Sequence, residues 1–496
     1  MSDVSNMSND LYLGIDLGTS SVKLTVIDGT GKPVESAQAD YDILRPLIYS
    51  GVKGSEDKEK AEGYEERPGD WMTAICKALG SMKEETRRSV RGISFSSQMP
   101  TLVVSSPDGT PLRNAILWCD NRAEAQGRML LEGAGRKEHF TRTGVMLDGR
   151  YLAPMYMWLA ENEPDILNND HYILSAGDWL YLKFTGLAAT NPSLASGYGI
   201  YNISRGAWDE SLMAITGIRS YMLPEVWPSH SAPGSLRRET AQILGLTAGI
   251  PVRLGAADSV AAVYGTGAAD AGDVCAMCGS STAMIAVTGR DASDEFRGFF
   301  ITPLTDEGAF GLEADILSSG KTIDWLRTLF GVSYDKLFDM IEKAAPDFGG
   351  VLATPYLMGG EQGVLWDSSL RAGVFGLNSS HGPGDIAGAF VFGVCCEMRR
   401  CLEAFSQVQT INRIVLSGPA AGNRVFMQML ADITGRTCIC SSVADASARG
   451  AAYIAAGIRS EADNEQAYIP GENRAAYDRH YREYIKVSAG SKQKGE

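Results

Sequence analysis

Long apolar runs are missing from this sequence. Ala389–Cys396 is among the longest, and it falls far short of the roughly 18 residues that a membrane-spanning helix needs. Met1–Asp10 is polar and has neither the basic nor the apolar region of a signal peptide. We therefore expect a cytoplasmic protein without a membrane partner.

Positive charge and cysteine are also scarce. There are 45 lysines and arginines against 60 aspartates and glutamates, and the net charge of −15 argues against an extended surface for nucleic acid. Nine cysteines in 496 residues are too few for a disulfide scaffold, and the five histidines are scattered. Cys275 and Cys278 have CxxC spacing, but no second pair accompanies them, so we expect buried thiols in place of a zinc site.

What is present is a repeat with a period of about half the chain. Leu11–Ile27 contains two β-rich runs around a turn of small residues, Gly18–Ser21. Val274–Val287 repeats this arrangement around Gly279–Thr282. A period this long indicates a duplicated domain and not a solenoid.

Strand-like and helix-like runs alternate in both halves, which predicts an α/β architecture with a mixed sheet in each. The predicted strands are Ile93–Phe95, Thr101–Val104, Ile116–Trp118 and Ile414–Leu416, and the predicted helices are Pro154–Leu159, Trp179–Phe184 and Ala448–Ile458. Turn signals and a strand at Leu246–Ala257 indicate the joint, giving domains over residues 10–252 and 253–485. We predict a mobile loop at the charged segment Ser50–Arg67 and a loose tail at Ser488–Glu496.

Both turns carry groups that suit an anion. Glycine lets backbone N–H groups approach phosphate oxygens, and hydroxyl groups add donors. These residues are Gly18, Thr19 and Ser20 in the first copy and Gly279, Ser280 and Ser281 in the second. Asp16 could hold a hydrated Mg²⁺ against the same oxygens. One such turn is more often a plain hairpin, but two of them suit a ligand with several phosphates lying between two domains.

Asp258 lies where an apolar strand, beginning at Leu254, runs into a helix of small residues. Its carboxylate could simply cap the helix N-terminus. Alternatively, it is a general base that takes a proton from a hydroxyl group attacking phosphorus, in a cleft at the joint between the domains.

Polar and aromatic residues follow two predicted strands of the first half. Gln98 offers a donor and an acceptor to hydroxyl groups, and Trp118 can pack on the C–H face of a sugar. Alternatively, Trp118 belongs to the core, and Asp120 and Arg122 form a helix cap and a surface ion pair. In the second half, the loop Gly418–Asn423 would admit a flat ring, although a purely structural strand–helix turn would look much the same.

Taken in order, these segments resemble the FGGY carbohydrate kinases over about residues 11–458. The motifs are Asp16-x-Gly-Thr, Glu66-Arg-Pro-Gly-Asp-Trp71, Ser97-Gln98, Ala115-Ile-Leu-Trp118-Cys-Asp, Asp178 with Phe184-Thr-Gly, Gly255-Ala-Ala-Asp258, Gly279–Thr282, Gly359-Gly-Glu361, Trp366-Asp367 and Leu430-Ala-Asp-Ile-Thr-Gly435. Each motif is permissive by itself, but the ordered series is specific. Within the family, the Gln98-Met99 pair and the run from Trp118 to Arg122 are most similar to xylulokinases.

The resemblance implies two duplicated actin-like ATPase (ribonuclease H-like) domains with a catalytic cleft between them. It implies Mg²⁺-assisted transfer of the γ-phosphate of ATP to a hydroxyl group of a small sugar, such as the pentulose xylulose. Another ketose, a polyol or an aldonate is an alternative substrate, and a non-catalytic sugar- and ATP-binding regulator is an alternative function.

The same resemblance assigns roles to single residues. Asp258 matches the catalytic base and lies against the sugar, and Asp16 matches the acid near the metal. The nucleotide residues are Gly18, Thr19, Ser20, Lys23, Gly279, Ser280, Ser281, Gly320, Gly418 and Asn423, and the sugar residues are Gln98, Met99 and Trp118.

Several positions depart from the family pattern. Pro100 stands where xylulokinases usually have histidine, and proline has no side-chain donor, so we expect a different sugar contact. Gln362 breaks the usual run after Glu361, Pro419 replaces a glycine, and Phe392 replaces a glutamate. The identity of the substrate, the hydroxyl that is phosphorylated and the oligomeric state therefore stay open, a homodimer being one alternative.

Overall fold

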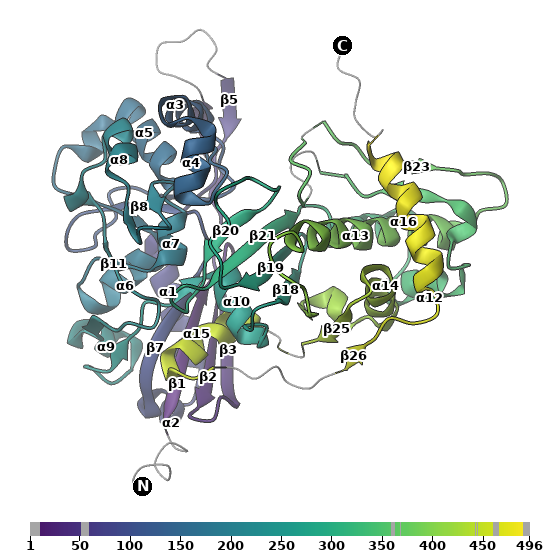
Figure 1. Ribbon diagram of the computed structural model, residues 1–496. Coiled ribbons are helices and arrows are strands. Elements are labelled where there is room, and N and C mark those ends of the chain that lie inside the picture. Colours follow the sequence, from purple (N-terminus) through teal and green to yellow (C-terminus); the bar gives the residue numbers. More distant parts are fainter. Residues whose placement is uncertain are drawn as a thin grey trace.

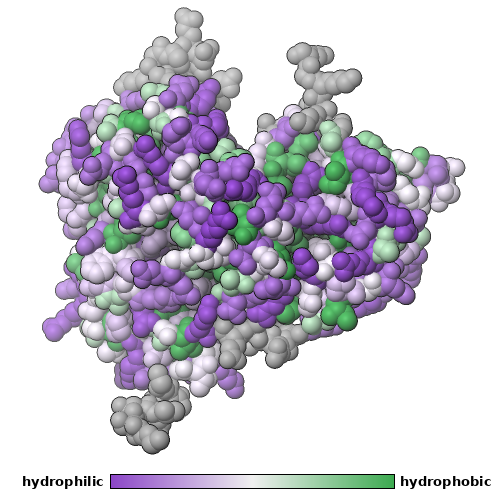
Figure 2. Space-filling model, in the orientation of Figure 1, coloured by the Kyte–Doolittle hydropathy of each residue, from purple (hydrophilic) through white to green (hydrophobic). Residues whose placement is uncertain are grey.

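The computed structural model describes residues 10–50, 59–358, 363–367, 369–441, 443, 445–459 and 466–489. Figure 1 shows two lobes side by side, the first mostly purple to teal and the second mostly green to yellow. On the face drawn in Figure 2, hydrophilic residues dominate and hydrophobic residues form small, separate patches. Within the described ranges, no helix combines the length and the apolar character that crossing a membrane requires.

The first lobe is built on a seven-stranded sheet centred on β1 (Leu11–Leu17). The other strands are β2 (Ser21–Asp28), β3 (Pro33–Asp40), β7 (Val90–Ser97), β15 (Gly234–Ser235), β16 (Pro251–Val252) and β17 (Ala256–Ala257). β1 runs antiparallel to β2 and parallel to β7, and β17 also runs parallel to β7. This mixed sheet agrees with the predicted α/β architecture.

The second lobe repeats this arrangement around β18 (Asp273–Cys278). Its seven-stranded sheet further contains β19 (Thr282–Thr288), β20 (Phe300–Pro303), β21 (Phe310–Ile316), β24 (Arg413–Ser417), β25 (Thr437–Cys440) and β26 (Ala467–Tyr468). β18 runs antiparallel to β19 and parallel to β24, just as β1 does with β2 and β7. The two predicted turns both lie between the first and second strands of their sheets, so the predicted duplication is confirmed.

Most of the predicted strands and helices are present. The four predicted strands coincide wholly or in part with β7, β8 (Leu102–Ser105), β9 (Ala115–Ile116) and β24. The three predicted helices coincide with α5 (Leu152–Asn162), α6 (Ala176–Thr185) and α15 (Ala446–Ala456). The domain boundary at residue 252 stays a prediction.

The predicted loop Ser50–Arg67 is wrong for its second half. β5 (Glu59–Glu62) pairs with β4 (Leu47–Ser50), and β6 (Glu65–Glu66) joins β9, β8 and β10 (Tyr172–Ser175) in a four-stranded sheet. Glu65 and Glu66 are both buried: Glu65 pairs with Arg113 and Arg122, and Oε2 of Glu66 accepts a hydrogen bond from the Trp71 indole. Residues 51–58 of the predicted loop lie outside the described ranges.

The predicted tail also begins too early. α16 (Arg474–Ala489) extends into it, and Ser488 is buried with its hydroxyl accepting a hydrogen bond from Arg400 at 2.6 Å. The remaining residues, 490–496, lie outside the described ranges.

Two helices of small residues pack tightly between the sheets. α10 (Asp258–Thr266) lies against α15, and α15 in turn covers one face of β1, β2 and β7 in the first lobe. A β-carbon on Gly265 would overlap the Ala446 carbonyl oxygen, and one on Gly450 would overlap that of Ala261. The two backbones therefore approach more closely than side chains on these residues would permit.

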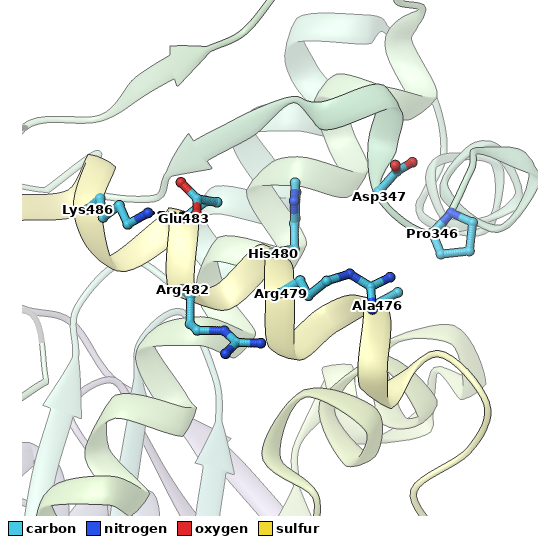
Figure 3. A pocket seen from close by; sticks show the side chains of 8 residues that line it. All are labelled: Pro346, Asp347, Ala476, Arg479, His480, Arg482, Glu483 and Lys486. Atoms are coloured by element: carbon cyan, nitrogen blue, oxygen red, sulfur yellow. Dashed lines mark hydrogen bonds and ion pairs between the residues drawn. The ribbon is translucent and has the colours of Figure 1, made fainter.

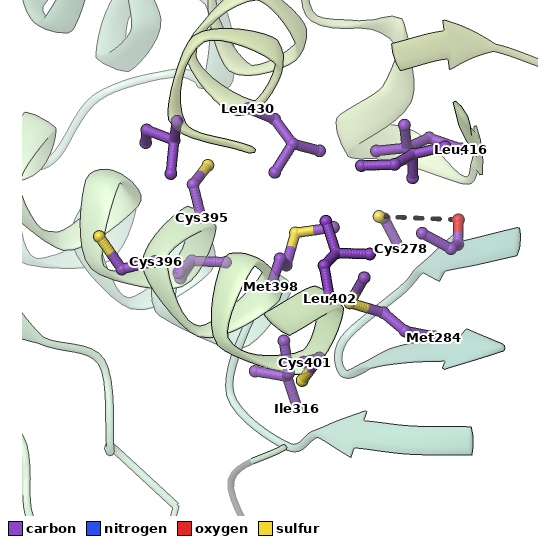
Figure 4. Packing of buried hydrophobic residues seen from close by; sticks show 14 of the residues in the cluster. Cys278, Met284, Ile316, Cys395, Cys396, Met398, Cys401, Leu402, Leu416 and Leu430 are labelled. Atoms are coloured by element: carbon purple, nitrogen blue, oxygen red, sulfur yellow. Dashed lines mark hydrogen bonds between the residues drawn. The ribbon is translucent and has the colours of Figure 1, made fainter. Parts of the chain in front are cut away.

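The core of the second lobe is rich in sulfur. In Figure 4, α13 (Pro383–Phe405) lies beside the sheet, with Cys395 pointing toward Leu430 and Cys401 toward Ile316. Cys275 and Cys278 are buried in β18, and burial raises the pKa of each thiol to about 12. The prediction of buried thiols at the CxxC pair is thus confirmed.

Candidate active site

The parallel strands β1, β7 and β17 bring polar and acidic residues to one edge of the first sheet. In the strand register, Asp16 of β1 pairs with Ser96 of β7, and Ala257 of β17 pairs with Ser97. Gln98 directly follows Ser97, and Asp258 directly follows Ala257. The carboxyl ends of neighbouring parallel strands are the usual place for a ligand in α/β proteins. Asp16, Gln98 and Asp258 therefore meet at an edge suited to binding and catalysis.

Asp16 is buried at this edge, with 6% of its surface exposed. Its Oδ1 accepts a hydrogen bond of 2.6 Å from the Ser96 hydroxyl. Burial and the negative charge of Asp445 raise the pKa of Asp16 to about 8, and Asp258 adds to the shift. The apoprotein thus holds this carboxylate in an environment that favours its neutral form.

Lys23 links the edge to the second lobe. It lies opposite Asp16 in the register of β1 and β2, and its Nζ is 2.9 Å from Oδ2 of Asp445. Burial works against its charge, but the hydrogen bond and charge of Asp445 raise the pKa of Lys23. Asp445 precedes α15 and was missed at the sequence level. Its acidic side chain just before a run of small residues that forms a helix was the available signal.

The first turn is held by two aromatic residues. The amide of Gly18 donates to the Ser21 carbonyl oxygen at 3.0 Å, and the Tyr41 hydroxyl donates to the Gly18 carbonyl oxygen. The Trp118 indole N–H donates to the Thr19 hydroxyl at 3.0 Å. Ser20, at the tip, is exposed. The predicted sugar residue Trp118 and the predicted nucleotide residue Thr19 thus touch, and Trp118, which is 40% exposed, is not a core residue.

The second turn is open to solvent and lined by glycine. Gly279, Ser280 and Ser281 are exposed, and Gly279 donates to the Ser281 carbonyl oxygen at 2.9 Å. α11 (Gly320–Phe330) begins against this turn, and a β-carbon on Gly320 would overlap the Gly279 carbonyl oxygen. Gly418 approaches from the other side with a φ of 93°, and a β-carbon there would overlap the Cys278 carbonyl oxygen. The structure therefore brings all these predicted residues together.

Asn423 has a structural role in the described structure. Its Oδ1 accepts hydrogen bonds from the amides of Val425 at 3.0 Å and Phe426 at 3.1 Å, capping α14 (Arg424–Thr434). Pro419 lies in the short 3₁₀ turn between Gly418 and Asn423. The oxygen of Asn423 is therefore engaged by the helix, which agrees with the structural alternative for this loop.

Asp258 is the first residue of α10 and not its cap. The cap position belongs to Ala257, and Oδ1 of Asp258 accepts from the neighbouring Ser259 amide at 2.8 Å. Burial raises the pKa of Asp258 to about 6; the Ser259 amide opposes this shift and the charge of Glu313 adds to it. A carboxylate with a pKa just below neutral suits a general base.

The backbone around Asp258 is fixed from both lobes. The Ser193 hydroxyl accepts from the Ala257 amide at 3.0 Å and donates to Oδ1 of Asn191 at 2.7 Å. From the second lobe, the Ser447 hydroxyl donates to the Asp258 carbonyl oxygen at 3.0 Å. These positioning contacts join segments far apart in the chain, so no local sequence pattern could have indicated them.

A buried polar pair underlies the predicted sugar site. Gln98 donates through Nε2 to Oε2 of Glu66 at 2.8 Å, and the Trp71 indole donates to the same oxygen at 2.7 Å. Burial raises the pKa of Glu66 to about 7. Met99 packs against Gly197, where a β-carbon would lie 2.7 Å from its Sδ. Glu66 was missed as a site residue because its segment was interpreted as a loop.

Asp120 and Arg122 do not form a surface pair. Both are essentially fully buried, and the guanidinium donates to the carboxylate at 2.9 and 2.8 Å. Arg122 also contacts Glu65 at 2.9 Å, and Asp120 accepts from the Tyr64 amide at 2.6 Å. The alternative of a surface pair is therefore wrong, because this ion pair is buried and contacts β6 through Glu65.

The residues present fit a nucleotide and a divalent cation. The exposed backbone of the two glycine turns can approach phosphate oxygens. Gly320 and Gly418 adjoin the second turn and have no side chains that would cover its backbone. Mg²⁺ prefers carboxylate oxygens and commonly takes only one or two of them together with phosphate oxygens. Asp16 can therefore supply the protein's part of such a site.

A cavity of about 760 Å³ lies elsewhere, along α16. Figure 3 shows charged side chains of both signs beside it, among them Arg479, Arg482, Glu483 and Lys486. Lys486 and Glu483 pair at 2.7 Å. The residues that line this cavity include none of those at the sheet edge, so the cavity is not the candidate active site.

Comparison with known proteins identifies the architecture. Residues 11–265 match the N-terminal domain of the FGGY family of carbohydrate kinases, and residues 274–457 match its C-terminal domain. A xylulose kinase of Bacillus subtilis is 29% identical over 90% of this chain and 87% of its own length, and a gluconokinase of Bacillus licheniformis is 25% identical over 89% and 86%. The crystal structure of a xyloylose kinase from Brucella ovis superposes with a TM-score of 0.87 at 25% identity, covering 97% of this chain and 99% of that one.

Proposed function

Because this chain belongs to the FGGY family of carbohydrate kinases, we propose that it transfers the terminal phosphate of ATP to a hydroxyl group of a pentulose such as xylulose. The observation that carries the proposal is the convergence of Asp16, Gln98 and Asp258 at one sheet edge, beside the first glycine turn. The second turn, in the other lobe, offers further exposed backbone for the phosphates.

The proposed chemistry assigns one task to each group. Asp258 takes the proton of the sugar hydroxyl while the hydroxyl oxygen forms a bond to the terminal phosphorus, and the bond from that phosphorus to the ADP oxygen breaks. A Mg²⁺ ion held through Asp16 would neutralise charge on the phosphate oxygens. Trp118 fixes the first turn through Thr19 and, with its exposed ring, orients the sugar.

The charges at the sheet edge favour a neutral sugar over an aldonate. Asp258, with a pKa of about 6, is largely ionised at neutral pH, Glu66, with a pKa of about 7, is partly ionised, and Lys23 is already paired with Asp445. The carboxylate of gluconate would be repelled there, since like charges in a partly buried site are strongly unfavourable. A ketose such as xylulose has no such charge, so an aldonate is the second candidate substrate.

The test is ADP release with xylulose, gluconate and glycerol as acceptors, in the wild type and in Asp258→Asn. We expect xylulose to stimulate turnover most, and the variant to lose about 10²–10⁴-fold in kcat while still binding nucleotide. Asp335→Asn, an exposed site on α12 (Tyr334–Lys343), is the control. Gluconate as the best acceptor would refute the choice of substrate. Full activity of Asp258→Asn would remove Asp258 from the mechanism, and sugar binding without turnover would favour a regulator.

A further inference from the structure

A second cavity lies at the far ends of the two helices that carry Asp258 and Asp445. It has a volume of about 380 Å³ and is lined by His230, Arg253, Tyr264, Asp306, Gly457, Ile458 and Arg459. Tyr264 lies near the end of α10, which begins at Asp258, and Gly457 directly follows α15, which begins just after Asp445. At about 1.5 Å per residue, some 9 Å of helix separates Tyr264 from Asp258.

Cationic and donor groups gather in this cavity. The half-buried Arg253 donates through Nη1 to the Ile454 carbonyl oxygen at 2.7 Å, and burial lowers the pKa of its guanidinium. Among the described residues, Tyr12 but no carboxylate opposes this lowering of the pKa of Arg253. Arg459 and His230 share Asp306, which lines the cavity, at 3.6 and 3.4 Å, and Arg459 also pairs with Asp270 at 3.4 Å.

Two further features favour a ligand. Tyr264 is 3% exposed, and its hydroxyl makes no hydrogen bond of normal geometry within the described part of the chain, although Asp306 and Thr305 lie beside it. A buried hydroxyl without such a bond is unfavourable, and a ligand oxygen that accepts from it would offset this cost. The missing side chain at Gly457 also matters, because a β-carbon there would lie 2.9 Å from Nη2 of Arg253 and crowd the guanidinium.

We propose that this cavity binds a small phosphate-bearing anion and that binding is transmitted along α10 and α15 to the active site. Two arginines and a tyrosine hydroxyl match the several acceptor oxygens of a phosphate group. The volume falls in the range of small-molecule sites and accommodates an inorganic phosphate or a phosphate monoester of sugar size. The tight glycine packing of α10 on α15 provides continuous contact from the cavity to Asp258 and Asp445.

The binding test is calorimetric titration of the full-length protein with inorganic phosphate and, separately, with glycerol 3-phosphate. A saturating non-hydrolysable ATP analogue with Mg²⁺ first occupies the active site, so that site cannot contribute. We expect one saturable site, weakened about tenfold or more in Arg253→Gln and weakened measurably in Tyr264→Phe. Arg238→Gln, an exposed arginine at the start of α9 (Arg238–Leu244), should bind like the wild type. The probe that binds more tightly shows whether the cavity prefers free inorganic phosphate or a phosphate monoester.

Three results would overturn the proposal. One is the lack of saturable binding of either probe, and another is unchanged affinity in both cavity variants. The third is a lower thermal midpoint of Arg253→Gln with an unchanged affinity for phosphate. That result would mean that Arg253 only caps the end of α15. If binding is transmitted to the active site, saturating phosphate should change kcat or KM of the wild type but not of Arg253→Gln. Equal responses of the two proteins would refute the transmission. Each of these binding results is independent of which sugar the enzyme phosphorylates.

Discussion

Replacing Asp16 with asparagine should stabilise the protein in the absence of metal and nucleotide while abolishing its activity. The carboxylate is buried beside Asp445 and Asp258, and its pKa is raised from 3.8 to about 8. Because the folded-state pKa lies above the unfolded-state value, ionisation destabilises the fold progressively as the pH rises from 3.8 to 8. Asparagine keeps the oxygen that accepts from Ser96 and removes the charge.

The magnitude follows from linkage. With one pKa unit equal to 1.36 kcal/mol, the ionised Asp16 destabilises the fold by about 2 kcal/mol at pH 5, about 4 kcal/mol at pH 7 and about 6 kcal/mol at pH 9. The advantage of Asp16→Asn over the wild type should therefore grow by about 4 kcal/mol between pH 5 and pH 9. For large domains this corresponds to roughly 10 °C in the midpoint of thermal unfolding.

The assay is thermal unfolding at pH 5, 7 and 9 with a chelator present, for the wild type, Asp16→Asn and the control Asp335→Asn. The control should differ from the wild type by a similar small amount at all three pH values. Adding Mg²⁺ and ADP should raise the midpoint of the wild type more than that of Asp16→Asn, since the metal removes the penalty on the carboxylate. A difference between wild type and Asp16→Asn that stays constant or shrinks with rising pH would refute this account of Asp16.

Further predictions concern the active site and the contact between the helices. The kcat/KM should rise with pH through an apparent pKa of about 6, since Asp258 acts as a base only when ionised, and a flat profile between pH 5 and 8 would contradict this role. Trp118→Phe should raise the KM for ATP several-fold by freeing Thr19. Ser193→Ala should lower kcat with little change in nucleotide affinity, because the Ala257 amide loses its acceptor. Gly450→Ala should lower the thermal midpoint, since overpacking destabilises by about 1–3 kcal/mol, and an unchanged midpoint would show that the helices can separate freely.

The sequence predicted the features that depend on local pattern. Alternating apolar residues and turns of small residues specify β1, β2, β18 and β19, so the duplicated hairpins could be placed to within about one residue. Asp16 was found because it lies at the end of a run of strand residues, and Asp258 because it directly follows one. Their proximity to Gln98 comes from parallel pairing with β7, which no local pattern encodes.

What the sequence did not provide depends on contacts between distant segments. Glu66 looks like part of a charged loop until Gln98 and Trp71 are seen to donate to it. Asp120 and Arg122 have the composition of a surface pair, but Glu65 and the Tyr64 amide complete a buried network around them. Asp445 became a site residue only through its ion pair with Lys23, more than 400 positions earlier in the chain.

The crossing of α10 and α15 also determines which relative movements the lobes can make. Gly265 and Gly450 present bare backbone to each other, so no interlocked side chains have to change rotamer when one helix slides along the other. Separation of the helices, by contrast, would expose a broad surface of alanine and valine to water. Small sliding displacements are thus favoured over opening at this contact, a shear rather than a hinge. Since Asp258 and Asp445 head the two helices, sliding changes their spacing directly.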